Sequence, residues 1–587
     1  MSKRYWPLVA LHRRLLDAER GAVVKDPGGR LKVALIYPNT YQVGMANLGL
    51  AVVYRLLNQR PEMLCERVFL PDRAEHRLYH KTRAPLLSLE SSRPVAEFDL
   101  VLVTISFEND APNLAAMLEQ AGLGMEAAGR EGPLVVAGGV AAMLNPEPYA
   151  DLMDGFLLGE AEVVLMPFIQ ALLELGPDRP RGELLPALAR RVRGFYAPGL
   201  YRPAYHRDGT LAGLTPSRGA PPRVEAPKYL GPAEGLARSV FLAPRAEFGQ
   251  MRLIEVGRGC GHGCRFCAAG HLLRPPRLGR GEDFLAPALE GVQEAGRVGL
   301  VSAAVSDLPG VGELARRVVK AGGRISVSSL RADRLEPGLV QALAASRHQT
   351  VALAPEAGSP RLRRIINKKL DEQELFAAVE ALVGAGIPNL RFYFMVGLPG
   401  EEDGDVDQLI ALARRLRQQV VSASRGRGHL GRVTISLNAF VPKPWTPFQW
   451  EPMPPLAVVK ERVKRVKSEL ARLANLKVVT DVPKYAQLQA VLARGDRRVG
   501  ALIRALARTP QPVRAYRTTG IDPEFYAHRA RRREELLPWQ VVDHGISLEY
   551  LWSEARRSRQ EKESPDCRPG ACIRCGACPP PTDQGES

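Results

Sequence analysis

Short apolar runs that alternate with helical patterns restrict the fold of this chain more than any other feature of its sequence. Three early runs are short, apolar and rich in β-branched residues, as buried strands are: Lys32–Tyr37, Leu100–Ile105 and Leu134–Ala137. Helical periodicity follows them, at 46–59, 111–122 and 160–173. Because strands that alternate with helices form parallel sheets covered by helices, residues 31–175 are predicted to form a doubly wound, Rossmann-like domain.

A second series of strands and helices begins at Arg252–Val256. Its later strands are predicted at Leu300–Val305, Arg324–Val327, Thr350–Leu353, Leu390–Val396 and Val433–Ala439. Helical patterns lie between most of them, so this unit of six strands is compatible with a partial barrel, which we assign to residues 248–450. The predicted fold class is therefore α/β, with two successive units.

The segments around these two units have other compositions. They are predicted to be a helical lead at 1–30, a Pro- and Gly-rich linker at 176–247 with a small β element at 195–205, a helical region at 451–558 and a polar, cysteine-rich tail at 559–587. In the helical region an apolar residue recurs every three or four positions from Val459 to Leu473, which predicts an amphipathic helix with Lys and Arg around its polar side.

The chain has a net charge of +18, and the excess is local. Between Lys460 and Arg517 there are 15 Lys and Arg against 4 Asp and Glu, so this stretch alone contributes +11. A second run, Arg414 to Arg432, has six arginines and no acid. Such a region suits a polyanion, RNA above all, although a solvated helix face would have the same composition, so both interpretations stay open.

The composition also excludes several classes of protein. The 587 residues are 45% apolar and 25% charged, which excludes wholesale disorder, collagen-like repeats and coiled coils. No apolar stretch reaches the roughly 18 uncharged residues needed to cross a bilayer. The N-terminus has no apolar run followed by a small-residue cleavage site. We therefore expect a cytoplasmic protein with no membrane partner.

The eight cysteines form two tight groups and one isolated residue. The isolated residue is Cys65, the first group is Cys260, Cys264 and Cys267, and the second group is Cys567, Cys572, Cys575 and Cys578. Eight cysteines are too few for a disulfide scaffold of this size. In a reducing compartment, such clusters indicate metal or iron–sulfur ligation instead.

The first group has the spacing C-x3-C-x2-C and directly follows the first predicted strand of the second unit. Three thiolates can hold three irons of a [4Fe–4S] cluster and leave the fourth iron open. The glycines around Cys260 allow a tight loop and leave backbone N–H groups free to bond cluster sulfides. A zinc site is the alternative, and it would need a fourth ligand such as His262 or His271.

This loop, with Phe266 between its last two cysteines, resembles the radical S-adenosylmethionine (SAM) superfamily. The hallmark of that family is C-x3-C-x-aromatic-C at the end of the first strand of a partial (β/α)6 barrel. The resemblance implies a [4Fe–4S] cluster whose open iron binds the amino and carboxylate groups of SAM. It also implies that an electron, from a donor such as flavodoxin or ferredoxin, cleaves SAM to methionine and a 5′-deoxyadenosyl radical.

Further residues resemble the SAM-binding elements of that family. Glu356 follows the fourth predicted strand, where relatives place an acidic residue against the SAM ribose. Gly397 lies in a segment similar to the fifth-strand element that packs against adenine, and Phe266 belongs to the cluster loop itself. Ser306 follows the second strand, where relatives bind the SAM amino group, although their usual Gly-Gly-Glu is absent. The resemblance therefore implies a SAM site at these four residues.

The N-terminal domain resembles cobalamin-binding domains. The matching positions lie in the loops after the three predicted strands: Asn39, Tyr41 and Gly44, then Ser106, then Gly138 and Gly139. A later turn, Gly159-Glu160-Ala161-Glu162, resembles one found in cobalamin-binding radical SAM proteins. Tyr41 stands where the cobalt-ligating histidine would be, and its phenol is a poor ligand. The resemblance therefore implies bound cobalamin whose cobalt lacks a protein histidine.

The second cysteine group has the spacing C-x4-C-x2-C-x2-C, which brings four thiolates within twelve positions. Four thiolates complete a zinc site or a second iron–sulfur cluster, and an unmetallated tail is the third alternative. Together with Leu492–Arg498 and Leu537–Ile546, this tail resembles an uncharacterised branch of the cobalamin-binding radical SAM proteins. That branch brings an architecture and cofactors but no known substrate.

The sequence thus predicts a cobalamin-dependent radical SAM enzyme, and the commonest reaction of its relatives is methyl transfer to an unactivated carbon. Methylation is inferred from the class and from no residue of this chain. Two alternatives remain: a rearrangement or ring formation that uses cobalamin without methylation, and an RNA- or ribosome-associated binding protein whose metal sites are structural. The basic region motivates the second alternative.

Overall fold

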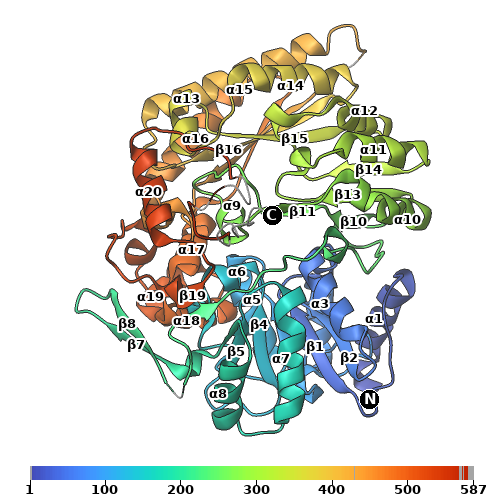
Figure 1. Cartoon of the computed structure of the whole chain (residues 1–587), viewed down its shortest axis with the longest axis vertical. Coiled ribbons are helices and arrows are strands. Elements are labelled where there is room, and N and C mark those ends of the chain that lie inside the picture. Colours follow the sequence, from blue (N-terminus) through green and yellow to red (C-terminus); the bar gives the residue numbers. More distant parts are fainter. Residues whose placement is uncertain (1–2, 218, 429, 568–571, 573, 579–587) are drawn as a thin grey trace, which may run out of the picture.

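The computed structural model describes residues 3–217, 219–428, 430–567, 572 and 574–578. Figure 1 shows an N-terminal unit, a second unit that follows it in the chain, and C-terminal helices that lie beside both. The predicted α/β fold class is confirmed. Among the described residues, no helix has the length and apolar character required to cross a membrane.

Five parallel strands and one antiparallel edge strand form the N-terminal sheet, in the order β2-β1-β3-β4-β5-β6. They are β1 (Leu31–Tyr37), β2 (Met63–Phe69), β3 (Leu100–Thr104), β4 (Leu134–Gly138), β5 (Gly155–Leu157) and β6 (Phe195–Tyr196). β1 and β3 are buried almost throughout, because helices cover both faces of the sheet. The strand order reverses between β1 and β3, where parallel sheets of this kind leave a crevice at their carboxyl edge.

Helices surround the sheet of this unit, and two of them begin at a side-chain cap. They are α1 (Trp6–Ala18), α2 (Tyr41–Gly44), α3 (Leu48–Asn58), α4 (Arg73–Thr82), α5 (Ala111–Gln120), α6 (Val140–Leu144), α7 (Ala161–Leu175) and α8 (Arg181–Arg191). The side chain of Asn47 accepts a hydrogen bond from the Leu50 N–H at the start of α3. Asp72 and Glu75 form a capping box at the start of α4. Helices α3 and α7 pack against each other.

Seven parallel strands form the second unit, in two sheets with the orders β10-β13-β14 and β15-β16-β17-β18. They are β10 (Arg252–Glu255), β13 (Arg297–Val301), β14 (Arg324–Val327), β15 (Thr350–Glu356), β16 (Asn389–Val396), β17 (Val433–Ala439) and β18 (Leu476–Thr480). A parallel bridge between Leu330 and Leu353 connects the two sheets, so the strands form one continuous open series. This arrangement is a partial barrel.

Helices connect these strands and cover their outer side. They are α9 (Ala269–Leu272), α10 (Leu285–Ala295), α11 (Val311–Lys320), α12 (Pro337–Ala345), α13 (Pro360–Ile365), α14 (Glu372–Gly384) and α15 (Asp403–Ala423). Ser359 caps α13 by accepting a hydrogen bond from Leu362 N–H, and Asp371 forms a capping box with Glu374 at α14. The strands therefore direct their carboxyl ends to one side, where the connecting loops gather.

The structure differs from the predicted elements at four places. β13 begins three residues before the predicted strand at 300–305. The sequence analysis did not predict β2, because Glu66 and Arg67 interrupt its apolar pattern. Both side chains are buried against polar partners from other segments, Ser88 for Glu66 and Glu19 and Glu90 for Arg67. The second unit has a seventh strand, the edge strand β18, which lies beyond its predicted end at residue 450. Within the predicted linker, the structure has the helix α8, which contains Pro186, whereas β6 falls inside the predicted β element at 195–205.

The linker also contains short strands that join other parts of the chain. β7 (Tyr201–Tyr205) and β8 (Leu211–Pro216) form a hairpin in and beyond the predicted β element at 195–205. β9 (Val224–Glu225) pairs with β19 (Val542–Asp543), which belongs to the C-terminal region. The predicted linker therefore pairs with the C-terminal region through β9 and does not simply extend between two domains.

The C-terminal helices pack on both units. They are α16 (Leu456–Leu470), α17 (Pro483–Arg494), α18 (Gly500–Arg508), α19 (Pro512–Thr519) and α20 (Leu548–Arg559). α16 packs against α15 of the second unit, α18 packs against α5 of the first, and α20 packs against α13. Val459, Val463 and the later apolar residues of α16 are buried, so the predicted amphipathic helix is confirmed.

Many basic residues of this region have partners within the chain. Arg462 binds Glu401, Arg465 binds Asp407, and Arg497 binds Glu147. Arg494 is fully buried and donates to backbone carbonyls near Glu451 and Ala527. Part of the basic excess that suggested RNA therefore serves to attach these helices to the two units. RNA binding stays a prediction.

A buried arginine ties the loop after β10 to α20. The Arg265 side chain has no exposed surface and donates to Glu554, which is 2% exposed, and to the backbone carbonyls of Arg364 and Ile365. Removal of one member of a buried pair leaves the other charge without its partner. We expect Arg265→Met to lower the unfolding free energy by about 3 kcal/mol in urea titrations. The half-exposed Arg465–Asp407 pair is the control, because Arg465→Met should cost less than about 1 kcal/mol. Equal losses in both variants would contradict this assignment.

Candidate functional site

The three-cysteine loop is closed by a short antiparallel pair directly after β10. β11 (Gly257–Arg258) pairs with β12 (Arg277–Leu278), and the loop between them carries the three cysteines and then α9. Gly259 has φ +81°, and a Cβ there would lie 2.7 Å from the Leu273 carbonyl oxygen. Gly263 also has a positive φ, of +68°. The loop therefore requires glycine at these two positions.

Backbone N–H groups point at the sulfur atoms of this loop. The Cys260 sulfur accepts from His262 N–H, and the Cys267 sulfur accepts from Ala269 and Gly270 N–H at the start of α9. Burial raises the pKa of both thiols, that of Cys267 to about 12. Buried thiols that face N–H donors are suited to become metal-bound thiolates, since a metal displaces the proton and the donors stabilise the resulting charge.

The surroundings of the two nearby histidines bear on the zinc alternative. Both ring nitrogens of His262 face carboxylates, with Nε2 2.5 Å from Asp307 and Nδ1 3.4 Å from Asp566. His271 is buried, and its Nδ1 bonds the Cys267 carbonyl. His262 therefore has no free ring nitrogen, whereas the buried Nε2 of His271 has no hydrogen-bond partner among the described residues. Within the described residues, no three His, Cys, Asp or Glu side chains already converge as ligands of a single ion.

Two of the predicted SAM residues lie where strands of the barrel end. Glu356 is the last residue of β15, has φ +68°, and its partly buried carboxylate lies 3.7 Å from Lys368 Nζ. Burial raises the pKa of Glu356, while Lys368 and Arg331 oppose the shift. Gly397 follows β16 with φ +82°, and its N–H donates to Glu401. Both residues thus adopt left-handed backbone conformations at the carboxyl edge of the sheet.

The other two predicted SAM residues lie near the same edge. Ser306 belongs to a short 3-10 helix at 305–307 after β13, and its hydroxyl accepts from the Arg331 N–H. Phe266 packs on a small apolar cluster that includes Ala357 and Phe440. Arg331 lies close enough to Cys264 and Asp307 for their charges to act on it. The structure thus gathers the loop, β13, β14 and β15 around one region.

Sequence reasoning missed several residues of this region. Asp307 bonds His262, Lys369 forms an ion pair with Asp566, and Asn367 donates to the carbonyls of His262 and Gly263. These contacts join segments more than 40 residues apart, so no local sequence pattern indicates them. The one local signal was the position of Asp566 directly before Cys567.

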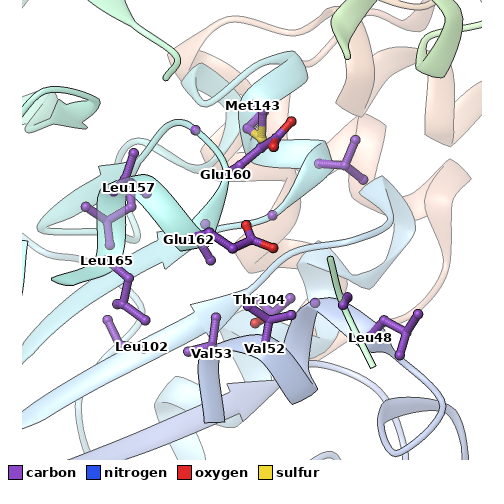
Figure 2. A pocket seen from close by; sticks show the side chains of 18 of the residues that line it. Leu48, Val52, Val53, Leu102, Thr104, Met143, Leu157, Glu160, Glu162 and Leu165 are labelled. Atoms are coloured by element: carbon purple, nitrogen blue, oxygen red, sulfur yellow. The ribbon is translucent and has the colours of Figure 1, made fainter. Parts of the chain in front are cut away.

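A cavity of about 280 Å³ lies in the N-terminal unit, between α3, α7 and the sheet. Figure 2 shows Val52 and Val53 of α3 in the lower part of the view, with Leu102 of β3 and Leu165 of α7 to their left. The wall is mostly apolar, and Glu160 and Glu162 are its main charged residues on this unit. Glu255, Arg258 and Leu273 of the second unit also line it, so the cavity reaches the cysteine loop. Such a slot fits a flat apolar group with a polar end.

Only two of the predicted cobalamin residues line this cavity. They are Gly138 and Gly139. Gly139 has φ +101°, and a Cβ there would lie 2.5 Å from the Ile105 carbonyl oxygen, so only glycine fits. The paired glycines therefore leave the β4 end of the slot without side chains.

The structure does not bring the other four predicted residues to the cavity. Asn39 donates to Asp110, and the Tyr41 hydroxyl donates to Glu19. Gly44 packs closely on Phe69, and Ser106 accepts from Asn47. Tyr41 is 9% exposed and contacts Phe69 edge-on.

Arg258 links the cavity to the cysteine loop. Its guanidinium lies 2.6 Å from Glu160, 2.9 Å from Glu162 and 2.7 Å from Glu255. Burial would raise the pKa of Glu160, but hydrogen bonds and charges from Arg277 and Arg258 lower it instead. Glu160 therefore stays ionised, and its ion pair with Arg258, together with that of Glu162, attaches the N-terminal unit to the residue just before Gly259-Cys260.

Comparisons with known proteins agree with the two-unit architecture. Residues 49–198 match a family model described as radical SAM proteins, N-terminal, and residues 254–413 match the radical SAM superfamily model. An uncharacterised protein of Methanocaldococcus jannaschii is 28% identical over 469 residues, which cover 79% of this chain and 88% of that protein.

Solved structures are more distantly similar. TsrM of Kitasatospora setae, a radical SAM methyltransferase solved with cobalamin and a [4Fe–4S] cluster, matches with a TM-score of 0.48 and 13% identity over 82% of this chain and 100% of that chain. The cobalamin-dependent radical SAM enzyme OxsB matches with a TM-score of 0.44 and 14% identity over 65% of this chain. The match spans about half of OxsB, 52% of its length.

A buried aspartate near the carboxyl edge of the N-terminal sheet gives a pH-dependent prediction. Burial, with help from Glu108, raises the pKa of Asp110 to about 6, against the hydrogen bond from Asn39. The folded state therefore holds this proton longer than the unfolded chain, so stability should fall as pH rises from about 4 to above 6. The unfolding free energy of Asp110→Asn should decrease by about 2 kcal/mol less than that of the wild type between these pH values. Urea unfolding at both pH values measures the difference. The exposed Asp403→Asn is the control, and an unchanged pH dependence in Asp110→Asn would contradict the prediction.

Proposed function

We propose, on the premise that this chain is a member of the radical SAM superfamily, that it is a cobalamin-dependent radical SAM enzyme that transfers a methyl group to an unactivated carbon. The observation that carries the proposal is the junction at Arg258. There Arg258, two residues before the first cysteine of the loop, binds Glu160 and Glu162 in the wall of the apolar slot. Arg277, on the other side of the loop, also binds Glu160. Two cofactors at these places would lie close to each other.

Cys260, Cys264 and Cys267 are the proposed ligands of a [4Fe–4S] cluster. Such a cluster supplies the electron that cleaves SAM to methionine and a 5′-deoxyadenosyl radical. The N–H groups of His262, Ala269 and Gly270 already bond the sulfurs, so the loop stabilises negative charge there. An external one-electron donor of the flavodoxin or ferredoxin class is required.

The carboxyl edge of the barrel is the proposed SAM site. Glu356 lies partly buried beside Lys368, and a carboxyl group at a strand end is suited to bond the hydroxyls of a ribose. Gly397 and Phe266 offer a side-chain-free backbone and an aromatic face for adenine. Ser306 orients the Arg331 backbone and can itself donate its hydroxyl proton to a ligand oxygen. The role of these residues is to orient SAM and exclude water from it.

The slot between α3, α7 and the sheet is the proposed site for the nucleotide tail of cobalamin. Its apolar wall suits a flat aromatic base, and Gly138 and Gly139 leave room for close approach at the strand end. Cobalamin supplies a cobalt centre that can carry a methyl group. Because the Tyr41 hydroxyl is bonded to Glu19, away from the slot, this tyrosine is not a cobalt ligand in our proposal.

Reductive cleavage of SAM is the first test. Anaerobically reconstituted protein with dithionite and SAM should form 5′-deoxyadenosine, and Cys264→Ala should reduce its formation at least about a hundredfold, because the cluster then lacks a ligand. Cys65→Ala is the matched control, since Cys65 is buried in β2 of the N-terminal unit. Chromatography with mass detection measures the product. Equal product from wild type and Cys264→Ala would overturn the assignment of the loop.

Occupancy of the slot is the second test. Val53→Trp should fill part of the cavity and weaken cobalamin binding about tenfold or more, while Val53→Ala enlarges it and should retain binding. Visible absorption during cobalamin titration measures the affinity. Iron content and thermal unfolding should match the wild type, which separates a filled slot from a damaged fold. Unchanged affinity in Val53→Trp would place cobalamin elsewhere.

A further inference from the structure

The C-terminal cysteine segment lies directly against the first cysteine loop. The Cys567 N–H donates to the carbonyl of Gly261 with a distance of 2.7 Å, and Gly261 is the neighbour of Cys260. A Cβ on Gly261 would lie 3.2 Å from the Cys567 carbonyl oxygen. More than 300 residues separate these two segments in the sequence, so only the tertiary fold brings both cysteine groups together.

Buried polar contacts hold this segment in place just before Cys567. Ser564 is 5% exposed, accepts from Arg265 and donates to Glu554, and its N–H donates to Asn367. Asp566 forms an ion pair with Lys369, and its carboxylate lies 3.4 Å from His262 Nδ1. Arg265 and His262 both belong to the first cysteine loop, so the segment is attached to that loop by side chains as well as by backbone.

The remaining tail cysteines lie near Cys567 and near positive charge. Cys572, Cys575 and Cys578 are close enough to Cys567 for their charges to act on it. Cys575 is 3% exposed, its carbonyl accepts from Ser547 N–H at the start of α20, and its sulfur is hydrogen-bonded by Arg274. Gly576 has φ +80°, which allows the chain to turn between Cys575 and Cys578.

Arg274 and Lys228 supply the charge around these thiols. Arg274 is 4% exposed and also donates to the Tyr550 hydroxyl. Lys228 donates to the carbonyls of Arg274 and His544, and the charge of Cys575 acts on it. Arg274 is buried and Lys228 is partly buried, and within the part of the chain that the structure describes neither forms an ion pair with a carboxylate. A thiolate-ligated centre with net negative charge would neutralise them.

We propose that Cys567, Cys572, Cys575 and Cys578 bind a second iron–sulfur cluster beside the first. The C-x2-C-x2-C rhythm is that of ferredoxin-type ligands, and a fourth thiolate completes the set. Four thiolates leave no iron open, so this cluster cannot bind SAM. Its chemistry is limited to taking up and releasing one electron at a time, and its position beside Gly261 suits exchange with the first cluster.

Metal analysis of variants tests the second site separately from the first. The wild type, reconstituted without oxygen, should contain about eight irons and eight sulfides per chain. The triple variant Cys260→Ala, Cys264→Ala, Cys267→Ala should keep about four irons with a Mössbauer signature of a cluster. The double variant Cys572→Ala, Cys578→Ala should also keep about four irons, and it should still bind SAM at the first cluster. Cys65→Ala should keep about eight.

Two results would overturn the second cluster. One is a triple variant with no iron, and the other is a wild type with about four irons and one zinc per chain, which would make the tail a zinc site. The wild-type metal count decides the matter even where the triple variant fails to fold. Failure of the proposed enzyme function would appear differently, as absent 5′-deoxyadenosine from a chain that still contains both clusters.

Discussion

The ion pairs of Arg258 with Glu160, Glu162 and Glu255 are the interaction on which the rest of this structure depends. One guanidinium, 11% exposed, joins the end of the N-terminal sheet to the barrel at the residue before Gly259. Buried charges of this kind are costly to separate, since either partner alone would remain unpaired in a poorly solvated place. The distance between the apolar slot and the cysteine loop is thereby fixed, and so is the relative position of any cofactors that they hold.

The C-terminal region completes this junction from the other side. Its helices pack on both units, and its basic residues make many of the contacts, as Arg497 does with Glu147 and Arg462 does with Glu401. Its last described segment then reaches the first cysteine loop through Ser564 and Asp566. Residues from three separate parts of the chain therefore surround one site. Part of the basic composition that suggested an RNA-binding surface therefore serves to attach the C-terminal helices to the two units.

Most of the fold follows from local patterns, and the exceptions have physical causes. β1, β3 and β4 are continuous apolar runs because helices cover both of their faces, so periodicity identifies them. Periodicity does not identify β2, because the polar residues Glu66 and Arg67 lie within it. Glu66 accepts a hydrogen bond from Ser88, and Arg67 forms an ion pair with Glu90. Periodicity also does not identify β18, because it is a half-exposed edge strand within a basic region of the sequence. For both strands, partners that lie far away in the sequence decide that the segment joins a sheet.

The sequence by itself determined the cysteine spacing, the glycines that the loop needs and the alternation that makes two parallel α/β units, because each of these depends on bonds and dihedral angles within a few residues. Only the tertiary structure decided that Gly138 and Gly139 line the slot while Tyr41 turns to Glu19. It also decided that Cys567 lies beside Gly261. Such placements arise from the packing of distant segments, and packing selects among the directions that a local sequence leaves equally open.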